Sequence, residues 1–251
     1  MGEVGDAEPL LARMREEVAR KETVIGLALV RQVEGIYLLA RGQPEPAARA
    51  SAEALGFYEQ AGYRRGSLGA RIRLGQAFTE LGQFKEAVDV LNEALEIAGG
   101  ADWTSAPVFA RRARAYLGTG QVAEARKDAE TGISMMRQFE NRAGEGEGRL
   151  SLALVLGASE PPDYAAAEQE FAEAEQCLRD CEYRTELALA LRCHGEMRQK
   201  TDGPDAAEPL LEEARALYAW MGRERDVAAV EALLGRAPAG PSPAVSTARD
   251  G

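Results

Sequence analysis

Residues 75–94, GQAFTELGQFKEAVDVLNEA, hold the pattern that decides the fold of this chain. Gly75 is followed twelve positions later by Ala87, and seven positions after that by Ala94. The register returns every 38 to 42 residues. A fixed period in this range is typical of an array of stacked supersecondary units. The five copies are Gly35/Ala47/Ala54, Gly75/Ala87/Ala94, Ala113/Ala125/Gly132, Val155/Ala167/Ala174 and Gly195/Ala207/Ala214.

The composition predicts an all-α chain. Ala, Leu, Glu and Arg dominate, and alternating runs of β-branched residues are absent. The helices are predicted in pairs, because turns such as Gly82-Gln83-Phe84 are short and contain a glycine that can end a helix. First helices are predicted at 22–41, 65–81, 106–119, 148–158 and 185–200, and second helices at 45–61, 84–98, 122–138, 163–181 and 205–221.

The two ends of the chain are less regular. Residues 1–21 contain a predicted helix at 7–21 that reads as the remnant of a preceding repeat. Residues 22–235 are predicted to form the array and to end in a closing helix at 224–235. From 236 to 251 the chain is rich in Pro, Ala, Ser and Gly without periodic apolar residues, which predicts a disordered tail.

The repeated small residues have a mechanical explanation. A glycine inside a helix costs about 0.5–1 kcal/mol relative to alanine. Gly35, Gly75 and Gly195 stand at one register, so close approach of a second helix must offset that cost. Larger apolar residues of the second helices, such as Leu91 and Leu211, are expected to fill the remaining space.

The bulk composition excludes several function classes. With 30 basic and 41 acidic residues the net charge is −11, which disfavours nucleic acid and anionic membranes as partners. Three cysteines argue against a secreted disulfide scaffold. The acidic N-terminus lacks the features of a signal peptide, and no apolar run approaches the length of a membrane span. We therefore predict a cytoplasmic protein.

The spacing of small residues on a helical hairpin resembles the tetratricopeptide repeat (TPR), over about 22–221. The tryptophan common early in the first helix is absent, as is the proline that often ends the repeat. The period near 40 exceeds the usual 34, which predicts longer linkers between hairpins. The resemblance implies a right-handed α-solenoid of five hairpins with a C-terminal capping helix.

A narrower resemblance lies at the C-terminus. Residues 206–214, AAEPLLEEA, with the following Leu217-Tyr218 and 221–226, are similar to the last repeat of large bacterial signalling proteins. In those families an ATPase module joined to a nucleotide cyclase or a DNA-binding region precedes a long TPR-like array. The length of 251 residues and the helix at 7–21 favour a detached portion of such an array. The resemblance implies a regulatory or scaffolding role and no enzymatic activity.

The concave wall of such a superhelix is built mainly from first helices. Positions two before and one after each first small residue should face inward, and these are Val33, Ile36, Arg73, Gln76, Arg111, Arg114, Ala153, Leu156, Cys193 and Glu196. We predict a partner-binding groove at Arg73, Gln76, Arg111 and Arg114. Arginine can donate two parallel hydrogen bonds to a carboxylate, so an acidic segment would suit these residues. The alternative interpretation is that these arginines bind no partner and only pair with nearby glutamates of the chain itself.

Three other groups of residues could suggest a metal, phosphate or catalytic site, but a structural role is favoured for each. Cys177, Cys181, Cys193 and His194 could suggest zinc, but adjacent residues on a helix point about 100° apart, so ordinary packing is favoured and no metal is predicted. Residues 144–148, GEGEG, resemble a phosphate-binding loop, but no strand precedes them and their glutamates would repel phosphate. They are predicted to be a linker. His194 is predicted to be exposed or half-packed, and neither a cofactor nor catalysis is expected.

Three functions remain open. The first is a non-catalytic protein-interaction or scaffolding module in bacterial signalling. The second is a sensor that binds a short peptide or a small molecule in the groove. The third is a structural spacer. Arrays with an incomplete first unit often expose an apolar flank, so self-association through 7–41 is a further expectation.

Overall fold

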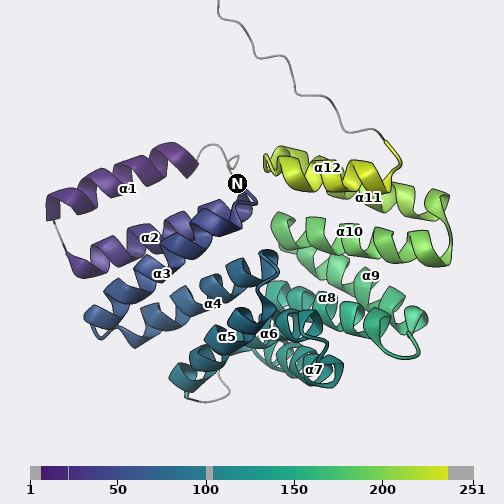
Figure 1. Ribbon diagram of the computed structural model, residues 1–251, viewed down its shortest axis with the longest axis horizontal. Coiled ribbons are helices and arrows are strands. Elements are labelled where there is room, and N and C mark those ends of the chain that lie inside the picture. Colours follow the sequence, from purple (N-terminus) through teal and green to yellow (C-terminus); the bar gives the residue numbers. More distant parts are fainter. Residues whose placement is uncertain (1–6, 22, 100–103, 237–251) are drawn as a thin grey trace, which may run out of the picture.

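The structure is a computed structural model and describes residues 7–21, 23–99 and 104–236. Within these ranges all the regular structure is α-helical, in twelve helices (Figure 1). Their bounds are α1 (Ala7–Lys21), α2 (Val24–Ala40), α3 (Pro44–Gln60), α4 (Arg64–Glu80), α5 (Phe84–Ala98), α6 (Ala106–Gly118), α7 (Val122–Gln138), α8 (Arg142–Ala158), α9 (Tyr164–Asp180), α10 (Arg184–Thr201), α11 (Pro204–Trp220) and α12 (Glu224–Leu233).

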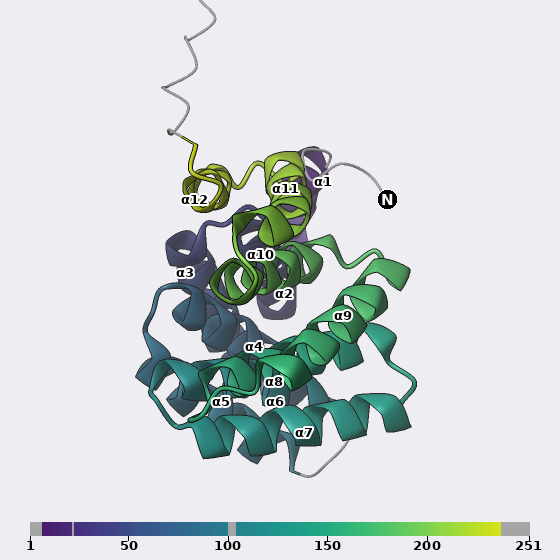
Figure 2. The same ribbon diagram turned by 90° about the vertical axis from the view of Figure 1, so that its right-hand side faces the viewer.

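The helices stack as hairpins along a curved path. Each helix packs against its neighbours in sequence, and α2, α4, α6, α8 and α10 also pack against one another in order. These first helices therefore form the inner layer, as predicted. In Figure 1 the path runs from α1 to α12, so that the last helices return toward α2 and α3. Figure 2 shows the same stack turned by 90°, with α12 at one end and α7 at the other.

Longer helices, rather than longer linkers, account for the period near 40. Helices α2, α3 and α4 each have 17 residues. The turns between them, 41–43 and 61–63, have three residues each, and two such helices with two such turns span 40 residues. The prediction of long linkers is wrong for these hairpins, because each helix gains length instead.

The turns depend on backbone that only a few residues adopt readily. Gly42 and Gly82 have φ of 65° and 73°, in the left-handed region that glycine enters without steric cost. Glu140 and Glu182 occupy the same place in later turns with φ of 53° and 51°. The same turn therefore forms there without its glycine.

Residues 144–148 are not a linker. Helix α8 begins at Arg142, and the Asn141 side chain caps it by accepting a hydrogen bond from the Gly144 N–H at 2.9 Å. A Cβ atom added at Gly146 would lie 2.8 Å from Leu178 Cγ, and one at Gly148 would lie 2.8 Å from Ile133 Cγ1. The glycines are needed for this close packing between helices.

The predicted role of the repeated small residues is confirmed. Ala47, Ala87, Ala125, Ala167 and Ala207 are all 0 % exposed. The glycines of the first helices also meet their partner helices. A Cβ atom at Gly75 would lie 2.6 Å from Leu91 Cγ, and one at Gly195 would lie 2.7 Å from Leu211 Cγ.

The ends of the array differ from its middle. Helix α1 packs on α2, and α12 packs on α11. The predicted disordered tail falls almost entirely on residues 237–251, outside the described ranges. None of the helices in the described ranges is long and apolar enough to span a membrane.

Candidate functional site

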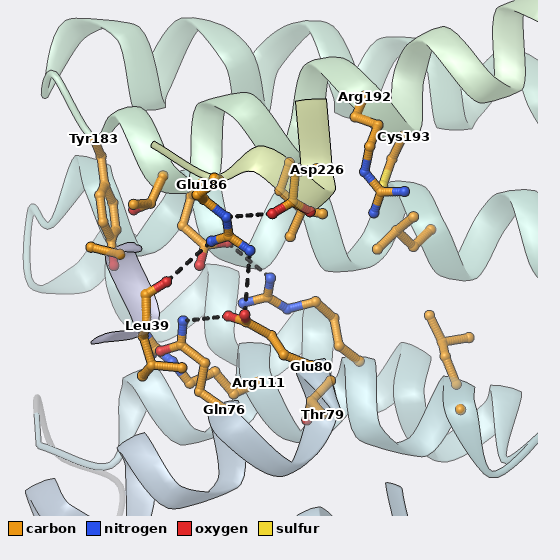
Figure 3. Close-up of a pocket in the computed structure, with 18 of the residues that line it drawn as sticks. Leu39, Gln76, Thr79, Glu80, Arg111, Tyr183, Glu186, Arg192, Cys193 and Asp226 are labelled. Carbon is orange, nitrogen blue, oxygen red and sulfur yellow. Dashed lines mark hydrogen bonds and ion pairs between the residues drawn. The ribbon is translucent and has the colours of Figure 1, made fainter. Parts of the chain in front are cut away.

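The inner layer encloses a pocket of about 690 Å³. Apolar side chains from α2, α6, α8 and α10 form much of its wall, among them Ile36, Leu117, Leu154 and Leu189. Figure 3 shows polar groups facing one another across this space, from the side of α4 and α6 and from the side of α10. Five arginines and three carboxylates line it: Arg73, Arg111, Arg114, Arg192, Arg223, Glu80, Glu186 and Asp226.

The structure brings the four predicted site residues together in this pocket. Arg73 and Gln76 come from α4, and Arg111 and Arg114 come from α6. Ile36 and Cys193, also predicted to face inward, line it too, whereas Ala153 and Leu156 are buried in the core. That these residues bind a partner stays a prediction.

Two of the arginines are already paired with carboxylates. Arg111 Nη1 lies 2.9 Å from Glu147 Oε2, and their side chains are 3 % and 6 % exposed. Arg114 Nη1 lies 2.9 Å from Glu186 Oε2, and their side chains are 11 % and 5 % exposed. Burial alone would lower the pKa of Arg111, but Glu147, Tyr183 and Glu186 together outweigh it and raise that pKa. For these two residues the structure favours the interpretation that the arginines neutralise nearby glutamates.

Arg73 has a different environment. Its Nη1 donates to Gln76 Oε1 at 3.3 Å. Among the described residues, it is the pocket-lining arginine with no carboxylate within ion-pair distance. Burial, followed by the neighbouring Arg111 guanidinium, lowers the pKa of Arg73. The charge of Arg73 is therefore poorly compensated by the protein itself.

The last turn of the array closes one side of the pocket, which the repeat pattern did not reveal. Arg223 lies between α11 and α12, and its Nη1 donates to the Leu39 carbonyl at 3.2 Å. Its Nη2 lies 3.3 Å from Glu80 Oε2, and its Nε lies 2.6 Å from Asp226 Oδ2 (Figure 3). Because Leu39 is 184 residues away in sequence, these contacts join the two ends of the curved path.

Two further residues that line the pocket, a cysteine and a tyrosine, are not activated for nucleophilic chemistry. Burial raises the pKa of the Cys193 thiol to about 11, so the thiol stays protonated near neutral pH. Burial also raises the pKa of Tyr183, with a further contribution from Glu147. Neither group has the lowered pKa of an activated nucleophile.

The remaining residues considered from the sequence, two cysteines and His194, lie outside the pocket. Cys177 and Cys181 are free thiols, and no cluster of three or more His, Cys, Asp or Glu suited to a metal occurs in the described part of the chain. The prediction that His194 is exposed or half-packed is wrong, because His194 is only 4 % exposed. Glu168 and Glu175 of α9 hold its ring, and no local sequence pattern indicates this pairing across two helices.

Comparison with known proteins agrees with this architecture. The tetratricopeptide repeat family model matches residues 68–100, which cover most of the α4–α5 hairpin. The chain is a TPR-like α-solenoid. No curated protein sequence matches it significantly.

Solved structures share the fold of this TPR-like chain at low identity. A Rap protein complexed with Competence and Sporulation Factor is 14 % identical with a TM-score of 0.64, over 90 % of this chain and 67 % of the other. The apo form of RapI is 13 % identical with a TM-score of 0.63, over 92 % and 85 %. A signal-transduction ATPase with a tetratricopeptide repeat sensor from Pyrococcus horikoshii is 15 % identical with a TM-score of 0.54, over 82 % and 32 %.

Proposed function

We propose that this chain is a non-catalytic regulatory module whose central pocket binds a short segment of a protein or peptide, or a small molecule of similar size. TPR-like solenoids present concave surfaces for interaction. The observation that carries the proposal is the pocket, whose volume of about 690 Å³ lies within the range typical of ligand sites. A pocket of this size suits a short ligand better than a long partner helix, which favours the sensor over the open scaffold.

The wall chemistry supports the same proposal. Apolar side chains supply binding surface, and a few polar groups supply orientation, as in most ligand sites. Carboxylates already pair with four of the five arginines that line this wall. Arg73 is left without such a partner among the described residues, so an anionic ligand is favoured beside it.

Two similar structures support a regulatory setting. The Rap protein is complexed with Competence and Sporulation Factor, and the Pyrococcus horikoshii protein is a signal-transduction ATPase with a repeat sensor. By analogy, ligand binding in this chain would change the curvature of the array and so alter its contacts in a signalling system.

The test uses two tryptophan variants on one helix. Ile36 lines the pocket and is 42 % exposed, so Ile36→Trp should fill the pocket without overpacking the core. Ile25 also lies on α2, is 45 % exposed and does not line the pocket, so Ile25→Trp is the matched control.

Random seven-residue peptides displayed on phage would be selected on the wild-type protein, and their affinities measured by fluorescence anisotropy. We expect Ile36→Trp to weaken the selected peptides at least about tenfold, which is about 1.4 kcal/mol. Ile25→Trp should leave the affinities unchanged. If no peptide is selected, or if both variants bind like the wild type, the pocket is not the binding site.

A further inference from the structure

We infer that the ligand of this pocket is an apolar molecule bearing a single carboxylate, and that Arg73 is the residue that binds this carboxylate. The inference rests on the proposed function and names the chemical class of its ligand. It also divides the four predicted site residues into one that receives the ligand's charge and others that support the wall.

The ion pairs around Arg73 indicate how many charges the ligand carries. Three guanidinium groups, those of Arg73, Arg111 and Arg114, face two carboxylates, those of Glu147 and Glu186. Each carboxylate is 2.9 Å from one of the other two arginines. One positive charge, that of the half-buried Arg73, is left over, and charges withdrawn from water are normally paired. A ligand with one negative charge would complete the cluster.

Arg111 and Arg114 do not need a ligand. Both form ion pairs with almost fully enclosed carboxylates, so their charges are compensated in the free protein. Arg73 has one long hydrogen bond to the neutral Gln76 side chain. Its remaining donors and its charge are available to a carboxylate, which arginine binds through two parallel hydrogen bonds.

The other residues that line the pocket indicate that the rest of the ligand is apolar and bears no second charge. Ile36, Leu117, Leu154 and Leu189 line it from four different helices, so an apolar body is favoured. At the closing turn, Glu80 and Asp226 are both held by Arg223. These carboxylates already satisfy that arginine and would repel a second anionic group on the ligand.

The first test needs no ligand. Without a counter-ion, Arg73 should destabilise the free protein, because binding sites are often kept at the expense of stability. We expect Arg73→Met to raise the Tm by about 2–4 °C, the shift that about 1 kcal/mol gives in a chain of this size. Arg111→Met should lower the Tm, because it leaves Glu147 buried and unpaired. Arg49→Met, on the exposed face of α3, should change neither stability nor binding.

The second test measures the charge requirement with matched probes. Isothermal titration would compare octanoate with octan-1-ol, and an N-acetylated Leu-Phe-Leu tripeptide with its C-terminal amide. We expect each carboxylate to bind at least about tenfold more tightly than its neutral counterpart, and Arg73→Met to remove that preference. The two pairs distinguish a small carboxylic acid from a peptide C-terminus as the source of the group.

The outcomes separate this inference from the proposed function. Equal binding of the acid and neutral probes, with both lost in Ile36→Trp, would overturn the inference and leave the pocket as the binding site. A carboxylate preference that survives in Arg73→Met, or a lower Tm for the free Arg73→Met protein, would also overturn it. If neither carboxylate binds, the inference falls, and the phage selection then decides the proposed function separately.

Discussion

At the scale of single residues, His194 shows how strongly the packing of two helices can control one side chain. Its ring stacks on Phe171 with centroids 5.0 Å apart. Its Nδ1 lies 2.7 Å from Glu175 Oε1, and its Nε2 lies 2.8 Å from Glu168 Oε2. Arg198 also binds Glu168, so four charged or titratable groups from α9 and α10 share this cluster. A positive imidazolium satisfies both carboxylates, because both of its ring nitrogens then donate.

The pH dependence of stability follows from this geometry. Burial alone would lower the pKa of His194, but the hydrogen bonds to Glu175 and Glu168 outweigh burial and raise it above its ordinary value of 6.5. The stabilisation is therefore fully present below pH 6.5 and is lost as the pH rises through the raised folded-state pKa.

We expect the unfolding free energy, measured by urea titration at several pH values, to fall as the pH rises above 6.5. In His194→Gln this fall should be absent, and the variant should be about 1.5–3 kcal/mol less stable at pH 6, the range for hydrogen bonds to charged groups. Parallel pH profiles for the two proteins would show that His194 is not protonated in the cluster.

At the scale of helices, the glycines of α8 are set by contact and not by local flexibility. Gly148 faces α7 so closely that an added Cβ atom would lie 3.2 Å from the backbone nitrogen of Ile133. Backbone atoms cannot move aside as the end of a side chain can. Gly56, inside α3, has no such neighbour within 4 Å.

Alanine should therefore have opposite effects at these two helical glycines. We expect Gly148→Ala to destabilise the protein by about 1–3 kcal/mol through overpacking. Gly56→Ala should stabilise it by about 0.5–1 kcal/mol, because alanine is the better helix former. Thermal unfolding followed by circular dichroism measures both, and a stabilised Gly148→Ala protein would contradict the proposed contact.

Features set by local sequence could be predicted, whereas features set by contacts between helices could not. Helices α5 and α7 have their predicted bounds, because turn chemistry and apolar period are local signals. The start of α8 could not be predicted, since alternating glycines are typical of loops and only Ile133 and Leu178 give them a helical role. Arg73, Gln76, Arg111 and Arg114 were placed on the inner wall by register alone. Their partners could not be predicted, because Glu147 lies in the predicted linker and Glu186 lies 72 residues from Arg114.

At the scale of the whole molecule, the curvature of the array brings distant repeats together at the pocket. Register along one hairpin does not determine this curvature, so Arg223 and Asp226 could not be assigned to the site from sequence. The contact between the ends is polar and small, and its central residue is Arg223, whose side chain is 13 % exposed. Gly42 lets this side chain approach, because a Cβ atom there would lie 2.9 Å from Arg223 Nε.

Removing this contact should open the array without unfolding it. We expect Arg223→Ala to increase the radius of gyration measured by small-angle X-ray scattering, while stability changes by no more than about 1 kcal/mol, as for partly exposed ion pairs. Arg225→Ala is the matched control, since its side chain is 82 % exposed and its own ion pair between α12 and α3, with Glu45, is long at 3.9 Å. Identical scattering from the Arg223→Ala and wild-type proteins would show that this contact does not hold the ends together.

The closing contact of Arg223 also has a consequence for timing. A molecule that leaves the pocket on this side can do so only after the hydrogen bond to Leu39 and the ion pair with Glu80 have broken. Dissociation then becomes a two-step event, and its slow step belongs to the protein. Residence time would follow how often the ends separate, so two molecules of different affinity would depart at similar rates.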